Sequence, residues 1–230
     1  MHAPIHDAGR RRWFKTSALL AATAATSGLM AFEPLLAAPP RMPIPSSPEA
    51  DDSLYMIGPR DGYSPYIGSL VSMMNYNRST IIKLTAGMTM EQLDHLHDPQ
   101  SNTIGALLMH LAVVDKVYYM NCFEKNREFT DEEKKFWEPA LDLDEKGRAE
   151  IKGKDLAYYV DLMTTTRAQT LEALKTKDDK WLLAVDYLFS KDQKFNNYWK
   201  WFHVCEHESH HRGQISWLKK RLPGMKDVKD

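Results

Sequence analysis

Four stretches of this chain repeat apolar residues every three, four or seven positions. They lie at about residues 63–84, 103–125, 154–174 and 196–221. This spacing places the apolar side chains on one face of an α-helix, and that face has to pack against other helices. Four amphipathic helices of this length predict an all-α fold, namely a four-helix bundle. No alternation of apolar and polar residues is long enough to predict a sheet.

The connection between the second and third predicted helices is long. It covers about residues 126–153, is rich in charged side chains and contains Pro139. A proline inside a helix removes one hydrogen bond and clashes with the preceding turn, so we expect only a short helix at 131–137. Because the connection is long, the second and third helices need not be hairpin neighbours.

The start of the chain differs in composition from the rest. Three arginines, Arg10 to Arg12, precede an uncharged stretch at 16–32 that is rich in Ala, Leu and Thr. A basic start followed by a moderately apolar run is typical of a secretory signal. The pattern Arg11-Arg12-x-Phe14 also resembles the twin-arginine export signal.

These features predict an exported, periplasmic protein with three segments. We expect a twin-arginine-type signal peptide at 1–38, a Pro-rich tether at 39–61 and the helical bundle at 62–230. The alternative for the apolar run is a membrane anchor. The run is short and diluted by Thr and Ser for crossing about 30 Å of hydrocarbon, so no stable membrane span is expected after processing.

Composition excludes two classes of function. The chain has 30 Lys and Arg against 31 Asp and Glu, without a basic cluster, so nucleic acid is not an expected partner. Two cysteines exclude a disulfide scaffold and a Cys-only zinc site. Cys122 and Cys205 are not expected to pair, because their estimated separation along the helices exceeds the reach of a disulfide.

Histidine is the unusual component, with nine in the chain and four of them between positions 203 and 211. At about 100° per residue, His203, His207, His211 and Gln214 share one narrow face of the last helix. Lys200 falls on the same face, where we expect its long side chain to reach out to water. Histidines at i and i+4 on one helix are a known way to present two imidazoles to one metal ion.

A third histidine could complete such a site. His110 lies at the centre of the apolar stripe of the second helix. Three imidazoles with an open fourth position would form a catalytic type of metal site. Two other interpretations stay open, because His110 could be a hydrogen-bonded core residue and the pair His207 and His211 could lie on a solvated face.

Two segments together resemble the DinB-like superfamily of metal-binding four-helix bundles. They are Asn102 to Ala112, read N-T-I-G-A-L-L-M-H-L-A, and His207 to Ile215, read H-E-S-H-H-R-G-Q-I. The resemblance covers roughly residues 62–222. It implies that His110, His207 and His211 bind a divalent metal ion, with zinc or nickel the usual metals of the family. It further implies a small-molecule substrate, because family members of known activity are mostly transferases or isomerases that use a low-molecular-weight thiol.

We therefore expect a metal-dependent enzyme, either a thiol-dependent transferase or isomerase or a hydrolase. A metal-binding or sensing bundle without turnover is the alternative, and a homodimer is compatible with either. Candidates for a catalytic role beside the metal are Glu208, Gln214 and His203. Arg167 lies in the inward stripe of the third helix, where it could bind an anionic substrate or pair with a buried carboxylate.

A zinc peptidase is a minor alternative. His207-Glu208-x-x-His211 matches the H-E-x-x-H helix signature, in which the glutamate is the general base. The extended metzincin pattern fails at Gln214 and Trp217, where it requires Gly and His. A downstream glutamate ligand is also absent, because no Glu follows Glu208.

Overall fold

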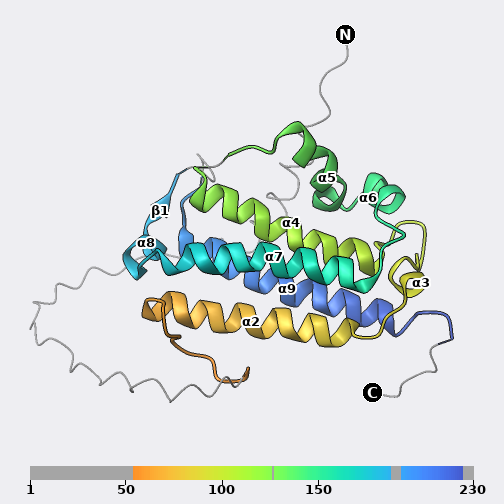
Figure 1. Ribbon diagram of the computed structural model, residues 1–230, viewed down its shortest axis with the longest axis horizontal. Helices are drawn as coiled ribbons and strands as arrows, with labels where there is room; N and C mark the ends of the chain where they lie inside the picture. Colours follow the sequence, from red (N-terminus) through yellow and green to blue (C-terminus); the bar gives the residue numbers. More distant parts are fainter. Residues whose placement is uncertain (1–53, 126, 188–192, 225–230) are drawn as a thin grey trace, which may run out of the picture. The chain divides into compact units, whose positions relative to one another are not determined.

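The protein is described by a computed structural model that covers residues 54–125, 127–187 and 193–224 (Figure 1). The predicted signal peptide at 1–38 and most of the predicted tether at 39–61 lie outside these residues. Within them, no helix combines the length and the apolar character that crossing a membrane requires.

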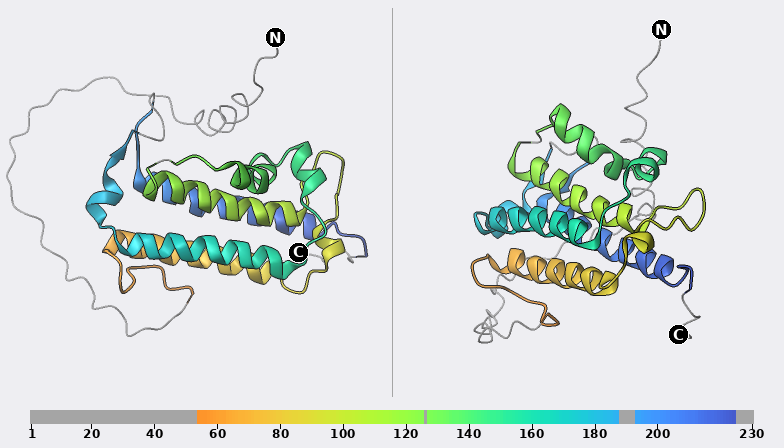
Figure 2. Two further views of the ribbon diagram at one scale, coloured as in Figure 1. Left: turned by 45° about the horizontal axis from the view of Figure 1, so that its top comes forward. Right: turned by 45° about the vertical axis from the view of Figure 1, so that its right-hand side comes forward.

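Four long helices run side by side in this part of the chain (Figures 1 and 2). They are α2 (Pro65–Thr85), α4 (Ile104–Phe123), α7 (Leu156–Lys175) and α9 (Asn197–Lys219). Both α4 and α2 pack against α7 and against α9, so the order around the bundle is α2, α9, α4, α7. The predicted all-α four-helix bundle is confirmed.

Polar side chains fix where three of these helices begin. Thr103 Oγ1 accepts a hydrogen bond from Ala106 N at the start of α4. Asp155 caps α7 and Asn196 caps α9 in the same way. Each cap satisfies a backbone N–H that has no partner inside its helix.

Shorter elements connect the long helices. They are α3 (Met90–Leu93), α5 (Asp131–Asp142), α6 (Glu145–Glu150), α8 (Asp179–Leu183), β1 (Val185–Asp186) and β2 (Phe195–Asn196). The two strands form an antiparallel ladder of only two residue pairs, Val185 with Asn196 and Asp186 with Phe195.

The prediction that the helix in the connection ends near residue 137 is wrong. Helix α5 begins at a capping box made by Thr130 and Glu133 and continues through Pro139 to Asp142. The proline removes one backbone hydrogen bond. Trp137, Pro139 and Ala140 are buried, since α5 packs against α4, and this burial offsets the loss.

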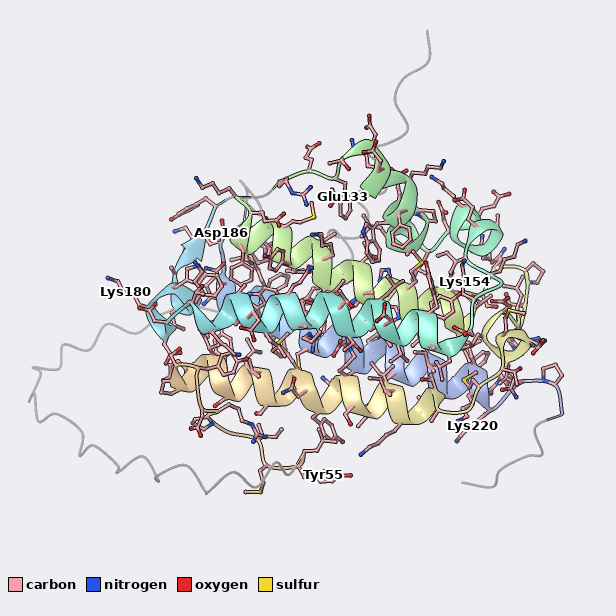
Figure 3. The ribbon with its side chains drawn as sticks, in the orientation of Figure 1. Tyr55, Glu133, Lys154, Lys180, Asp186 and Lys220 are labelled. Atoms are coloured by element: carbon pink, nitrogen blue, oxygen red, sulfur yellow. The ribbon has the colours of Figure 1, made fainter. Side chains whose placement is uncertain are left out.

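Side chains fill the space between the helices (Figure 3). Most of the buried ones are apolar, and a buried charged layer divides this core into two parts. One apolar cluster includes Leu107, Met163 and Ile215, and a second includes Leu70, Tyr118 and Trp201. Each long helix contributes one charged residue between the two clusters, and these four residues are Arg78, Asp115, Arg167 and Glu208.

Candidate metal centre

Three histidines from two neighbouring helices meet inside the bundle. His110 comes from α4, and His207 and His211 come from successive turns of α9. One ring nitrogen of each lies within 4.8 Å of the other two. His207 Nε2 lies 2.9 Å from His110 Nε2 and 3.0 Å from His211 Nε2. All three side chains are buried.

Hydrogen bonds at the opposite ring nitrogens orient two of these histidines. His110 Nδ1 lies 2.7 Å from the carbonyl oxygen of Ala140, and His211 Nδ1 lies 2.8 Å from Gln214 Oε1. Both partners can only accept, so each Nδ1 carries the hydrogen and each Nε2 presents a lone pair to the centre. Such an outer partner fixes both the tautomer and the ring angle of a metal-binding histidine.

The local chain conformation makes the Ala140 carbonyl available. Helix α5 ends at Asp142, and Leu143 follows in the left-handed conformation with φ of 50°. The last four carbonyl groups of a helix have no partner inside that helix. The carbonyl of Ala140 is one of these, and it accepts from His110.

The protonation states of the three imidazole rings suit the binding of a cation. Burial lowers the pKa of His110 to about 3 and that of His211 to about 4, and it lowers the pKa of His207 as well. All three rings are therefore neutral at pH 7. His207 Nε2 can donate to at most one of its two neighbours, so at least one of the short contacts has no proton between its two nitrogens, which repel each other.

A divalent ion removes this repulsion. Zinc–imidazole bonds of about 2.0–2.1 Å in a tetrahedron separate the ligand nitrogens by about 3.3–3.4 Å. The distances of 2.9 and 3.0 Å between the ring nitrogens are close to this value. The three histidines thus fit a three-imidazole site with a fourth position for a further ligand.

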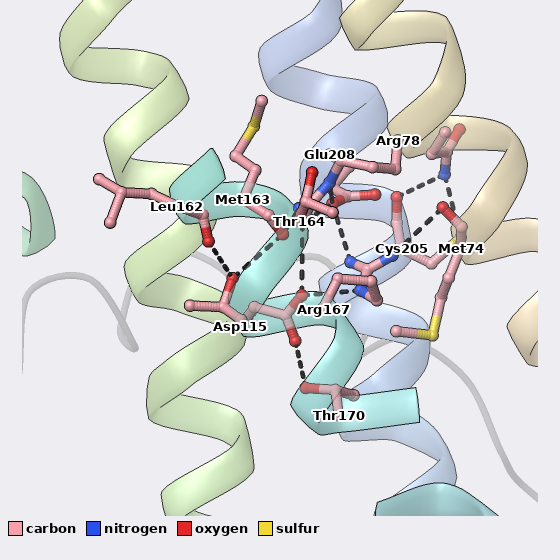
Figure 4. A network of polar contacts seen from close by, with 12 residues as sticks. Met74, Arg78, Asp115, Leu162, Met163, Thr164, Arg167, Thr170, Cys205 and Glu208 are labelled. Carbon is pink, nitrogen blue, oxygen red and sulfur yellow. Dashed lines mark hydrogen bonds and ion pairs between the residues drawn. The ribbon is translucent and has the colours of Figure 1, made fainter. Parts of the chain in front are cut away.

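Glu208 belongs to the charged layer, although it follows His207 in sequence (Figure 4). Its Oε1 accepts hydrogen bonds from Arg78 Nε at 2.8 Å and from Arg167 Nη2 at 2.8 Å. The side chain is buried. Because two guanidinium groups hold this carboxylate, the geometry gives no support to a role as general base at the histidines.

Asp115 completes the layer. Its Oδ2 accepts from Arg167 Nε at 2.7 Å, and its Oδ1 accepts from Thr170 Oγ1 at 2.6 Å. Burial disfavours the charged form of Arg167, but the charges of Asp115 and Glu208 outweigh this effect and raise its pKa. Arg167 is therefore the partner of buried carboxylates, one of the two roles that the sequence left open.

The other candidates from the sequence occupy different places. Gln214 lies beside the centre and bonds His211, as its position on the helix suggests. His203 is buried one turn before His207, but its Nδ1 lies 3.0 Å from Glu206 Oε1 and its ring stacks on Trp199. His203 is not part of the group of three converging nitrogens.

The expectation that Lys200 reaches water is wrong. Its side chain is fully buried, and Nζ donates to Asn121 Oδ1 and to Asp186 Oδ2. These two partners offset the free-energy cost of burying the ammonium group. The ion pair also ties strand β1 to α9, and no spacing in the sequence could have indicated it. Cys122 and Cys205 are free thiols, as expected.

A cleft of about 530 Å³ opens next to the metal centre. One wall is the segment 100–102, which leads into α4. The other wall is α9 between His210 and Leu218, and it includes Gln214. The residue that orients His211 therefore also faces a space large enough for a small molecule.

The bundle and the three converging histidines define a DinB-like protein with a candidate metal centre between its second and fourth long helices. Residues 69–224 match the family model described as Mycothiol-S-transferase. Because this match covers well over half of the chain, the protein belongs to that family, which is DinB-like. No curated protein gives a significant match to the chain.

Proposed function

We propose that this protein is a metal-dependent S-transferase that uses a low-molecular-weight thiol, with mycothiol as the first candidate. The observation that carries the proposal is the convergence of three neutral, buried imidazoles on one point. Support also comes from the family to which the chain belongs. Zinc or nickel is the proposed metal, because imidazole suits both.

The residues of the chain would prepare the site for this reaction. A divalent ion held there would supply Lewis acidity that stabilises the thiolate form of a thiol. His110 and His211 keep their Nε2 atoms deprotonated through the bonds to Ala140 and Gln214. In the transfer, the thiol proton leaves to solvent, a carbon–sulfur bond forms, and the leaving group of the electrophile departs with its electron pair.

The metal site is tested by metal content. We expect about one equivalent of metal in the wild-type protein and loss of it in His110→Ala and in His211→Ala, measured by mass spectrometry on protein folded in the cytoplasm. His210→Ala is the matched control, because His210 is exposed on the same helix and outside the converging group. A full metal load in His110→Ala would overturn the shared site.

The reaction class is tested by the need for thiol. We expect turnover of a reactive electrophile only when a thiol is added, with loss of turnover in His110→Ala. Turnover with water alone would support a hydrolase instead. No turnover of any electrophile by the fully metal-loaded protein would favour the alternative of a metal-binding bundle without catalysis.

We also propose that the protein is exported through the twin-arginine route, on the basis of Arg11, Arg12 and Phe14. Cell fractionation tests this. We expect the wild-type protein in the periplasm and the Arg11→Lys/Arg12→Lys double variant in the cytoplasm. Equal distribution of the two proteins would contradict the proposal.

A further inference from the structure

The buried charged layer distributes its charges over the four long helices in a definite way. Both carboxylates, Asp115 and Glu208, come from α4 and α9, the two helices that carry the three histidines. Both arginines, Arg78 and Arg167, come from α2 and α7. None of the four residues is more than 6% exposed, so water hardly competes for their contacts. Each helix with converging histidines is therefore held by cations from helices without them.

Arg167 joins the two carboxylates directly (Figure 4). Its Nε donates to Asp115 Oδ2 at 2.7 Å, and its Nη2 donates to Glu208 Oε1 at 2.8 Å. The third nitrogen, Nη1, donates to the carbonyl oxygen of Met74 on α2 at 3.3 Å. A guanidinium group is planar and rigid, so its bonds fix the directions in which the two carboxylates lie. Arg167 thus connects α4 to α9 through a fork of fixed shape.

Arg78 makes a weaker connection between the same carboxylates. Its Nε and Nη2 both donate to Glu208 Oε1, at 2.8 and 2.5 Å, whereas Nη2 lies 3.3 Å from Asp115 Oδ2. Its Nη1 donates to the carbonyl oxygen of Met163. Arg78 therefore holds mainly the carboxylate on α9, and Arg167 is the principal link between the two helices.

This link lies close to the histidines along both helices. Glu208 directly follows His207, about 1.5 Å further along α9, and Asp115 lies about 7.5 Å from His110 along α4. Rotation of either helix about its own axis would move its carboxylate and its histidine together, because both side chains are attached to the same helical backbone. A restraint on the carboxylates is therefore also a restraint on how the histidines face one another.

A metal site requires such a restraint. The groups that bind an ion have to be held within about 0.5 Å and about 10–20° of the productive geometry. Stability alone does not call for buried ion pairs, since apolar side chains of similar volume often stabilise a core as well or better. Hydrogen bonds are directional and apolar contacts are not, so the charged layer can supply an orientation that an apolar layer would not.

We propose that Arg167 is a positioning residue for the candidate metal centre. By joining the carboxylates of α4 and α9, it sets the relative rotation of these helices and hence the geometry in which the three histidines bind a metal ion. The inference rests on the metal binding in the proposed function and does not depend on thiol transfer. Removal of the link weakens and distorts metal binding in a protein that is still folded.

Zinc affinity tests the link. Arg167→Lys keeps the positive charge but replaces the fork by a single ammonium group, so we expect the Kd for zinc, measured by competition with a chelator, to rise by about 10–100-fold. Thr170→Val is the matched control on the same helix. It removes the hydrogen bond to Asp115 Oδ1 but leaves the link between the carboxylates in place, so its Kd should remain that of the wild-type protein. Circular dichroism verifies that each protein is folded.

The visible spectrum of bound cobalt is a readout that a merely structural role would not change. Cobalt(II) binds imidazole sites, and the intensity of its bands reports the coordination geometry. We expect the bands of a four-coordinate ion in the wild-type protein and in Thr170→Val, and weaker, shifted bands in Arg167→Lys. Asp115→Asn weakens the same link from α4 and should change the spectrum in the same direction. This second variant keeps the test decisive if Arg167→Lys does not fold.

The outcomes separate this inference from the proposed function. An unchanged zinc Kd and an unchanged cobalt spectrum in Arg167→Lys, together with a lower melting temperature, would overturn the positioning role and leave the metal centre in place. Failure of the wild-type protein to bind any metal would overturn the metal centre itself, and the positioning role with it. Neither readout needs turnover, so a wild-type protein without transferase activity would still give a result.

Discussion

At the scale of single residues, His207 and Glu208 are neighbours in sequence that serve different layers of the bundle. His207 faces His110 and His211, whereas Glu208 faces Arg78 and Arg167 on α2 and α7. Successive residues on a helix point about 100° apart, so one turn of α9 can contribute to both layers. The layer holds two cations and two anions, and removing one of them leaves a buried charge uncompensated.

Glu208→Gln is therefore expected to lower stability rather than to act on the reaction chemistry. The free energy of unfolding should fall by about 3–5 kcal/mol, because Arg78 and Arg167 then share a single carboxylate. Denaturant unfolding measures this. Glu206→Gln, at an exposed position of the same helix, should change stability by about 0.5 kcal/mol or less. Equal effects of the two substitutions would contradict the account of the charged layer.

The buried histidines predict how the stability of the metal-free protein depends on pH. Burial holds the pKa of His110 at about 3 and that of His211 at about 4 in the folded protein, whereas the unfolded chain has values near 6.5. Between pH 6.5 and 4 the unfolded chain thus binds protons that the folded protein does not. Stability falls as the pH drops through this range, by up to about 1.4 kcal/mol per pH unit for each histidine.

Urea unfolding of chelator-treated protein at pH 7, 6 and 5 tests this dependence. A double variant, His110→Asn/His211→Asn, should show a flatter profile, because two of the three buried histidines with lowered pKa values are gone and only His207 remains. The prediction fails if the wild-type protein and the double variant have the same slope.

Much of the site could be predicted at this scale. The spacing of His207, His211 and Gln214 fixed their common face, because helix geometry depends only on sequence separation. The contribution of Ala140 could not be predicted, since every residue has a carbonyl and the tertiary fold decides which one meets His110. The burial of Lys200 depends in the same way on Asp186, a partner brought close by the fold.

At the scale of elements, the helix pair α5 and α6 supports the candidate metal centre from outside the four-helix bundle. Helix α5 supplies the Ala140 carbonyl to His110, and α6 packs against α5. The sequence predicted the four long helices well, because their apolar faces are long and periodic. The predicted end of α5 is too early, because the prediction considered only the local destabilisation by Pro139. Burial of this part of α5 against α4 offsets that effect.

A pair of glycine substitutions tests how closely α6 approaches α5. A Cβ atom at Gly147 would lie 2.6 Å from the carbonyl oxygen of Pro139, so Gly147→Ala should lower the free energy of unfolding by about 1–3 kcal/mol. Gly213→Ala meets nothing within 4 Å and should raise it by up to about 1 kcal/mol, since alanine is the better helix former. Thermal unfolding compares the two. If Gly147→Ala left the free energy of unfolding unchanged, the two helices would be able to move apart without loss of stability.

At the scale of the whole molecule, the candidate metal centre joins two helices that are far apart in sequence. His110 on α4 and the pair on α9 are separated by the connection, by α7 and by the β1–β2 ladder. Only the folded chain brings their nitrogens within 4.8 Å of one another. A metal ion that binds this arrangement and not the unfolded chain must stabilise the fold.

Removal of metal is therefore expected to lower the melting temperature. With free metal at about 100 times its Kd, the stabilisation is about 2.7 kcal/mol, which corresponds to about 5–10 °C for a domain of this size. Differential scanning calorimetry with and without chelator measures the shift. His210→Ala should keep it, whereas His110→Ala should lose it, because the remaining pair on α9 no longer links two helices. If removal of metal lowered the melting temperature of His110→Ala as much as that of the wild-type protein, the metal would be bound by α9 alone. It would then not stabilise the fold by linking α4 to α9.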